Sequence, residues 1–404
     1  MPKIFKKWSR REFLKTTGAV GVGSVLAPLC GSIQTAHPAD KTEKVPRRPF
    51  GKTGIDVPIL ALGGMFDTQS GQLMLRQAVQ WGVTYWDTAA LYGYGRSEAG
   101  MGRYFQKFPQ DRPKIFLVTK SDHLDIQGLT RSLEGSLKRL QTSYVDLYLA
   151  HGISSIQALH PGTRQWVEKV RTQGKIRLFG FSTHENMANC LRDGARLGWI
   201  DGIMTIYNYR LTNEPDMMAA IKDCVAAGIG LTAMKTQGDG AAISDPAVRQ
   251  RLFGPLLARG FTEHQAKLKV VWEHPDMASI CSQMPSLPIL KANVIAARDP
   301  VKLTSLDRAA LTEYDRETFP GYCAGCADIC ENLVGRPAPI SRIMRYLMYS
   351  RSYGDHQRAR DLYQTLPASV RRRTVLLDYD KAEEQCPRKM AIGRLMREAS
   401  ILFA

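Results

Sequence analysis

Four side chains of complementary type stand at or just beyond the ends of short apolar segments: Asp87, Tyr92, Lys120 and His151. A tyrosine serves as a general acid only when its pKa is brought toward the working pH, and a neighbouring lysine ammonium does this by stabilising the phenolate. An aspartate beside the lysine fixes its position and charge, and a neutral histidine donates a hydrogen bond to a carbonyl oxygen on which charge develops. This set of groups is suited to the reduction of a carbonyl by hydride.

The residues that must position this set lie on short apolar segments, which alternate with helical patterns from residue 56 onward. Such alternation is typical of parallel βαβ units. The pattern predicts eight strands, at Val57–Leu62, Thr84–Thr88, Ile115–Lys120, Val145–His151, Ile176–Ser182, Gly202–Asn208, Ile229–Lys235 and Ala278–Met284. It predicts helices at Leu73–Trp81, Leu129–Leu140, Thr163–Thr172, Glu185–Leu197 and Pro215–Ala227, and a closing helix at Thr304–Thr318.

The strand count and a span of about 250 residues favour an α/β fold of the (β/α)8 TIM-barrel type over a doubly wound sheet. No Gly-x-Gly-x-x-Gly turn follows the first predicted strand, which also disfavours a Rossmann domain. Side chains at the carboxyl ends of barrel strands converge over the barrel mouth. The four polar residues are therefore expected to meet there.

Four segments of the chain resemble the aldo/keto reductases, in order and at comparable spacing: residues 86–93 (WDTAALYG), 118–120 (VTK), 149–151 (LAH) and 180–184 (GFSTH). The resemblance covers roughly residues 47–300, and the five-residue step from Asp87 to Tyr92 is its most specific element. It implies a (β/α)8 barrel, a catalytic tetrad of Asp87, Tyr92, Lys120 and His151, and a nicotinamide dinucleotide cofactor, usually NADPH.

The resemblance also implies residues that bind this cofactor. Ser182 matches the serine that holds the nicotinamide carboxamide in the family, and Asn293 matches the asparagine that meets the adenine. Asn208 and Lys235, at the ends of the sixth and seventh predicted strands, complete the set of cofactor-binding candidates. No basic residue clearly marks a 2′-phosphate site, so the choice between NADP(H) and NAD(H) stays open.

The C-terminal segment contains Cys323, Cys326 and Cys330 in C-x2-C-x3-C spacing, and a remote Cys386 followed by proline. Iron–sulfur clusters commonly use three thiolates close in sequence and one remote. The arrangement resembles the ferredoxin-like C-terminal extension of some aldo/keto reductases and implies one 4Fe-4S cluster. Zinc and disulfides are the alternatives, although no histidine lies at finger spacing and Cys323 and Cys326 are too close for an easy bridge.

The net charge of +17 is concentrated at the two ends, because residues 1–48 carry +7 and residues 340–404 carry +6. Neither end interleaves basic and aromatic residues as a single-strand binding groove does, so no nucleic-acid partner is expected. Arg10-Arg11 is followed by Phe-Leu-Lys at 13–15 and an uncharged apolar run to Leu29, which resembles a twin-arginine signal. We expect export by the twin-arginine machinery, to the periplasm or to a membrane anchor that faces it.

Three domains are predicted: an export signal and linker at 1–48, the barrel at 49–319, and a small helical, cysteine-containing extension at 320–404. The predicted function is NAD(P)-dependent hydride transfer to or from a small-molecule carbonyl or alcohol, with Tyr92 as general acid, coupled to an iron–sulfur module and a redox partner. The alternative is an exported iron–sulfur electron-transfer or partner-binding protein whose barrel is catalytically silent. Departures from the family pattern at Thr183, Met204 and Gln283 motivate this alternative.

Overall fold

The computed structural model describes residues 44–404 except 239–244 and 335–337. The predicted twin-arginine motif lies outside the described residues and stays a prediction. The linker was expected to reach residue 48, but Val45 is 3% exposed and Arg47–Pro49 form strand β1. The folded part therefore begins before the boundary that the sequence predicts.

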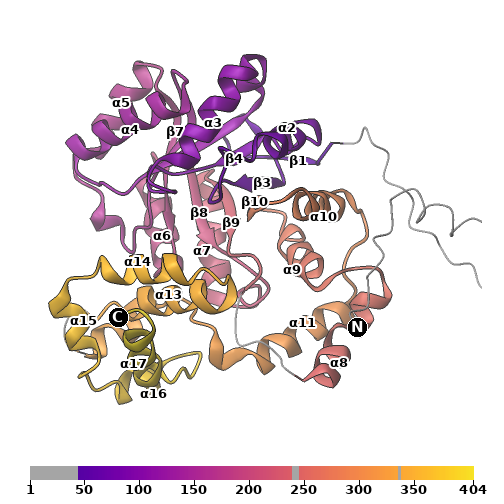
Figure 1. The fold of residues 1–404 in the computed structure, drawn as a ribbon, viewed down its shortest axis with the longest axis vertical. Coiled ribbons are helices and arrows are strands. Elements are labelled where there is room, and N and C mark those ends of the chain that lie inside the picture. The colour runs from indigo at the N-terminus through magenta and orange to yellow at the C-terminus, as the bar shows by residue number, and fades with distance from the viewer. Residues whose placement is uncertain (1–43, 239–244, 335–337) are drawn as a thin grey trace, which may run out of the picture. The chain divides into compact units, whose positions relative to one another are not determined.

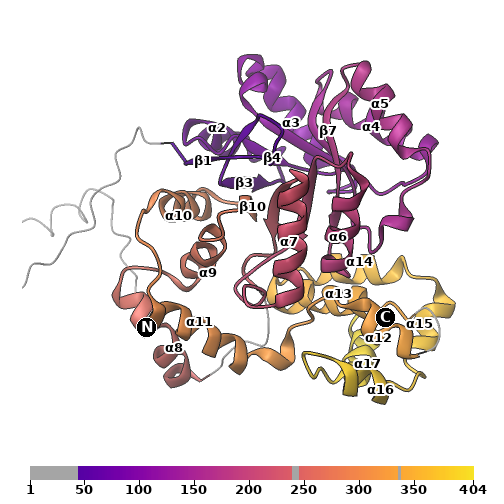
Figure 2. The same cartoon turned by 180° about the vertical axis from the view of Figure 1, so that it is seen from behind.

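Eight parallel strands close into a barrel in the order β10-β3-β4-β5-β6-β7-β8-β9 (Figures 1 and 2). Their bounds are β3 Leu60–Gly63, β4 Tyr85–Asp87, β5 Phe116–Ser121, β6 Val145–Ala150, β7 Ile176–Thr183, β8 Gly202–Ile206, β9 Gly230–Met234 and β10 Met277–Gln283. The strands are almost wholly buried, as expected where helices cover a parallel sheet. The predicted TIM barrel and its eight strands are confirmed.

One predicted strand is divided. Residues 57–62 were expected to be continuous, but the chain breaks at Ile59 into β2 (Asp56–Pro58) and β3. Strand β2 pairs with β1 in an antiparallel hairpin outside the barrel. The loop of this hairpin carries Phe50, which is fully buried. A Cβ atom at Gly230 would lie 2.5 Å from the Phe50 ring, so glycine at that position lets the ring seat against the barrel.

Helices connect the strands. They are α2 Gln72–Gln80, α3 Arg96–Lys107, α4 Ile126–Leu140, α5 Thr163–Thr172, α6 Met187–Leu197, α7 Pro215–Ala227, α8 Pro246–Ala258, α9 Glu263–Trp272, α10 Leu287–Arg298 and α11 Ser305–Glu317. Helices α2, α4, α5, α6, α7 and α11 were expected from the sequence, and every end lies within three residues of its predicted position. Helices α3, α8, α9 and α10 were not assigned from it.

The C-terminal extension is helical, as predicted. It comprises α12 Ala327–Cys330, α13 Ile340–Ser352, α14 His356–Gln364, α15 Ala368–Thr374, α16 Asp380–Gln385 and α17 Ile392–Leu402. These helices bury an apolar cluster of their own, which is separate from the barrel core. The described barrel and extension nevertheless belong to one compact unit.

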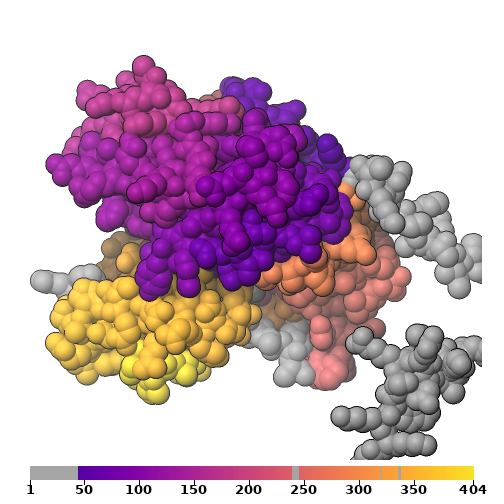
Figure 3. Space-filling model, turned by 45° about the horizontal axis from the view of Figure 1, so that its top comes forward, coloured from indigo at the N-terminus to yellow at the C-terminus, as the bar shows by residue number. Residues whose placement is uncertain are grey.

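Helices α13 and α14 lie across one end of the barrel (Figures 1 and 2). The Arg358 side chain on α14 contacts the Met65 sulfur, which follows β3. Figure 3 shows the extension's yellow surface directly against the indigo surface of the first barrel elements. The extension therefore covers part of the end at which the strands terminate.

Within the described ranges, no helix is both long and apolar enough to cross a membrane.

Candidate active site

The four residues of the predicted tetrad meet at the carboxyl ends of adjacent strands. Asp87 is the last residue of β4, Lys120 lies near the end of β5, His151 follows β6, and Tyr92 lies between β4 and α3. The Lys120 ammonium forms an ion pair of 2.6 Å with the Asp87 carboxylate. The same ammonium donates hydrogen bonds to the Thr88 carbonyl at 2.8 Å and to the Tyr92 hydroxyl at 3.4 Å.

The lysine of this site remains charged. Burial alone would lower the pKa of Lys120, but contact with the Asp87 carboxylate, together with Tyr92 and Cys281, raises it above its usual value. Burial is also the largest effect on the phenol and outweighs Lys120, so the pKa of Tyr92 is raised to about 12. In this arrangement Tyr92 is therefore a protonated hydrogen-bond donor at neutral pH.

The histidine is oriented by a residue that the sequence analysis did not single out. The His151 Nδ1 atom lies 2.8 Å from the Asp122 carboxylate. The rings of Tyr92 and His151 meet edge to face, with 5.8 Å between their centroids. Asp122 stands two residues after Lys120, so its position just beyond the end of the predicted strand was the signal that could have identified it.

Cys281 also lies in this site. The Cys281 thiol donates to an Asp87 carboxylate oxygen at 3.6 Å. Burial, followed by the Asp87 charge, raises the pKa of the Cys281 thiol well above its usual value. The thiol is therefore a neutral neighbour of the tetrad.

Two of the predicted cofactor-binding residues already form hydrogen bonds within the protein. The Ser182 hydroxyl accepts a hydrogen bond from the Gly152 amide at 2.9 Å. Both amide protons of Asn208 are used, on the Lys235 carbonyl at 3.2 Å and on the Tyr322 hydroxyl at 3.0 Å. Tyr322 belongs to the segment just before the cysteines, so the extension occupies a group expected to face the cofactor.

The side chains of the other two cofactor candidates, Asn293 and Lys235, also have partners within the protein. The Asn293 amide, on α10, donates to the Ser282 hydroxyl at 3.0 Å. Lys235 follows β9 with a positive φ of 56°. Its ammonium lies 4.6 Å from the Tyr349 ring centroid and 4.9 Å from that of Tyr353, so two aromatic rings of the extension hold it.

A cavity of about 550 Å³ separates the barrel end from the extension. His184 and Lys235 line it from the barrel, and helices α9, α13 and α17 contribute further side chains. Among its lining side chains only Glu263 is acidic, against five cations: Lys235, Lys267, Arg345, Arg351 and Arg394. A cavity of this size and charge suits an anionic small molecule.

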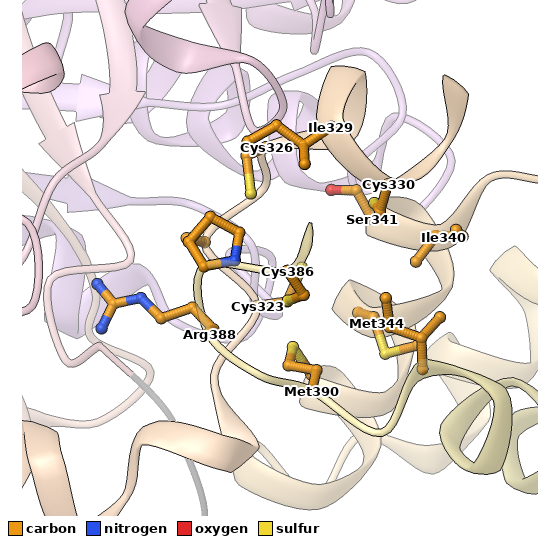
Figure 4. Close-up of a pocket in the computed structure, with 13 residues that line it drawn as sticks. Cys323, Cys326, Ile329, Cys330, Ile340, Ser341, Met344, Cys386, Arg388 and Met390 are labelled. Atoms are coloured by element: carbon orange, nitrogen blue, oxygen red, sulfur yellow. The ribbon is translucent and has the colours of Figure 1, made fainter. Parts of the chain in front are cut away.

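The four predicted cysteine ligands line one small pocket, although 56 residues separate Cys330 from Cys386. Figure 4 shows them around the pocket, with the Arg388 guanidinium directed away from it. None of the seven cysteines in the described part is in a disulfide. In the same part, no three His, Cys, Asp or Glu side chains are arranged to hold a single metal ion.

The cysteine pocket shares Cys323 and Met344 with the larger cavity, so the two spaces adjoin.

Residues 60–249 match the model of the Aldo/keto reductase family. The chain is 28% identical to an aldo-keto reductase of Mycolicibacterium vanbaalenii over 65% of this chain and 92% of the relative. It is also 28% identical to an aldo-keto reductase of Schizosaccharomyces pombe, whose name specifies NADP(+), over 49% of this chain and 60% of that relative. Residues 60–249 of this chain are therefore similar to the aldo/keto reductases.

Solved structures agree on the fold. A thermostable aldo-keto reductase bound to the inhibitor epalrestat is 25% identical, with a TM-score of 0.54 over 66% of this chain and 98% of that one. The holo form of an aldo-keto reductase from Bacillus halodurans is 22% identical, with a TM-score of 0.55 over 67% and 96% of the two chains. About a third of this chain thus lies outside these matches.

Proposed function

We propose that this protein transfers hydride between a nicotinamide dinucleotide and a small-molecule carbonyl or alcohol. The observation that carries the proposal is the contact of the Lys120 ammonium with both the Asp87 carboxylate and the Tyr92 hydroxyl at the end of the barrel. Similarity to the aldo/keto reductases supports it, because residues 60–249 match that family and the name of one relative specifies NADP(+).

Each tetrad residue has a role in this chemistry. Tyr92 donates its hydroxyl proton to the carbonyl oxygen as that oxygen gains negative charge. Lys120 stabilises the phenolate that remains, and Asp87 holds the lysine in place. His151 lies edge to face with the Tyr92 ring, and the contact of its Nδ1 atom with the Asp122 carboxylate at 2.8 Å fixes the orientation of the imidazole beside the reacting oxygen.

Some of the predicted residues fit a nicotinamide dinucleotide, and one does not. When bound, the nicotinamide would supply or accept the hydride. The cationic cavity that includes Lys235 fits a diphosphate, and His184, just after β7, lines it. The Asn208 amide does not fit as a carboxamide ligand, because its donors are already used by Tyr322 and the Lys235 carbonyl. We assign cofactor contacts to the cavity and not to Asn208.

The proposal is tested by Tyr92→Phe, which removes the proton donor and keeps the ring. We expect kcat for carbonyl reduction to fall by about 10²-fold or more, measured by oxidation of NADPH and of NADH with a panel of aldehydes and ketones. Tyr94→Phe is the matched control, because Tyr94 lies on the same loop and is 85% exposed. Equal rates for the two variants would contradict the proposal.

We further propose that Cys323, Cys326, Cys330 and Cys386 hold a 4Fe-4S cluster that exchanges electrons with the barrel site. Their shared pocket supports this, since four thiolates are the usual ligands of such a cluster. Burial raises the pKa of Cys323 to about 12, so only a bound cation would keep this thiol ionised.

Iron, sulfide and zinc analysis of protein purified without oxygen tests the cluster. We expect about four irons per chain and a brown colour. Cys326→Ala should abolish both, whereas Cys224→Ala, which changes a buried barrel cysteine, should keep them. Stoichiometric zinc, or a count of free thiols that shows paired cysteines, would contradict this proposal.

A further inference from the structure

One asparagine at the end of the barrel binds the cysteine segment, residues 323–330. Asn186, the residue before α6, has a left-handed backbone with a φ of 50°. Its backbone N–H donates to the Gly325 carbonyl at 2.7 Å. Its carboxamide oxygen accepts a hydrogen bond from the Asp328 backbone N–H at 2.9 Å, and its carboxamide nitrogen donates to the Asp328 carboxylate at 2.8 Å. Three hydrogen bonds thus join this barrel residue to the segment.

The backbone of the cysteine segment fits closely against the same turn of the barrel. Gly325 has a φ of 76°, and a Cβ atom there would lie 2.5 Å from the His184 carbonyl oxygen. A side chain at position 325 would therefore force the segment away from the barrel. Glycine permits the close approach that brings Asp328 within reach of Asn186.

The same carboxamide also contacts the loop after β6, which begins with the tetrad histidine. The Asn186 side-chain nitrogen donates to the Ser154 carbonyl at 3.3 Å. In that loop, the Gly152 N–H donates to the Ser182 hydroxyl at 2.9 Å, and the Ile153 N–H donates to the Ser182 carbonyl at 2.9 Å. Asn186 therefore links the cysteine segment to the loop after β6, and this loop is bonded to the end of β7.

We propose that Asn186 is a positioning residue through which the cysteine segment fixes Ser182 and the loop after β6. Affinity for the nucleotide then depends on whether the Cys326 thiol is held in its pocket. The inference rests on the proposed hydride chemistry and deepens it, because Ser182 is a candidate contact of the nicotinamide. By thermodynamic linkage, bound nucleotide stabilises the held state of the thiol by the same factor by which that state favours nucleotide binding.

Two other hydrogen bonds of the cysteine region supply matched controls. The Asn189 side chain, on α6, donates to the Asp328 carboxylate at 3.3 Å, and its oxygen accepts from Arg192 on the same helix at 3.3 Å. Tyr322, just before the segment, accepts from the Asn208 amide at 3.0 Å. None of these partners belongs to the loop after β6, so Asn189→Ala and Tyr322→Phe test whether the proposed route is specific.

The first experiment measures amide hydrogen exchange and needs no turnover. It follows residues 152–155 in the full-length protein, in Cys326→Ala, in Asn186→Gly and in the double variant. Glycine at position 186 removes the carboxamide and keeps the left-handed backbone without steric cost. Cys326 lies between the two residues of the segment that Asn186 binds. We therefore expect Cys326→Ala to speed exchange about fivefold or more, and to add nothing once Asn186→Gly is present.

The effect of Cys326→Ala should persist in proteins that also carry Asn189→Ala or Tyr322→Phe. An effect of equal size with and without Asn186→Gly would overturn the inference, because the signal would then travel by another route. Unchanged exchange in Cys326→Ala alone would overturn it as well. Both outcomes leave the proposed function intact.

The second experiment separates positioning from a general loss of stability. Asn186→Gly should raise KM for the nucleotide about fivefold, with little change in kcat, because His151 keeps its contact with Asp122. A variant that is merely less stable contains less active enzyme, so its kcat falls while KM stays the same. That result would contradict the positioning role.

Dissociation constants for NADPH and NADH, measured by quenching of tryptophan fluorescence, extend the comparison to protein that is not turning over. Cys326→Ala should weaken binding about fivefold in the otherwise unchanged protein and not in Asn186→Gly. Additive effects of the two substitutions contradict the inference alone. Failure of both nucleotides to bind the unchanged protein contradicts the proposed function and the inference together.

Discussion

At the scale of single residues, burial keeps the Tyr92 phenol protonated, and one carboxylate adds to this effect. Asp87 lies 2.6 Å from the Lys120 ammonium and offsets the charge that would otherwise favour a Tyr92 phenolate. Burial then dominates, and the pKa of Tyr92 rises to about 12. A buried Tyr–Lys contact is thus not by itself enough to make an acidic phenol.

Asp87→Asn tests this balance. Asp87 raises the pKa of Tyr92, so removal of its charge should lower that pKa from about 12. Reduction requires protonated Tyr92, so the alkaline limb of kcat/KM for carbonyl reduction should move to lower pH. The pKa of Lys120 should fall as well, because burial is no longer offset.

The control for this variant is Asp216→Asn, at an exposed position on α7. It should leave the alkaline limb where it is in the unchanged protein. An Asp87→Asn profile with the same limb as this control would show that the carboxylate does not set the protonation of Tyr92.

At the scale of elements, strand ends were the part of the site that the sequence could predict. Asp87, Lys120 and His151 each follow a short apolar run, and the parallel register brings such ends together. Helix α3 was missed because Gly100 and Gly102 weaken its pattern. A Cβ at Gly102 would lie 2.1 Å from the Arg139 carbonyl, so close packing with α4 requires glycine where helix propensity disfavours it.

Contacts between distant elements were beyond the sequence. Asn208 looked available to a cofactor, but its partner Tyr322 lies 114 residues further on. The aromatic rings that hold Lys235 come from α13 and the residue after it, and nothing in the local pattern around Lys235 indicates them. Composition and periodicity report which face of an element is buried, and they do not report what covers it.

At the scale of the whole described chain, a buried ion network joins the cysteine loop to the barrel. Arg388, two residues after Cys386, is 3% exposed and contacts Asp315 at 3.2 Å and Glu214 at 3.1 Å. Arg210, which follows β8, contacts the other oxygen of Asp315 at 2.6 Å. One carboxylate of α11 is thus shared between a barrel arginine and an extension arginine.

Replacement of Arg388 should weaken the ion network that holds the cysteine loop to the barrel. Arg388→Met removes one of the two arginines that contact Asp315, and loss of hydrogen bonds to a charged group costs about 1.5 kcal/mol or more. We expect a lower free energy of unfolding in urea and faster proteolysis of the segment around Cys386. Arg372→Met, at an exposed arginine of the same extension, should change neither. Unchanged stability and unchanged protease resistance in Arg388→Met would show that this network does not hold the cysteine loop to the barrel.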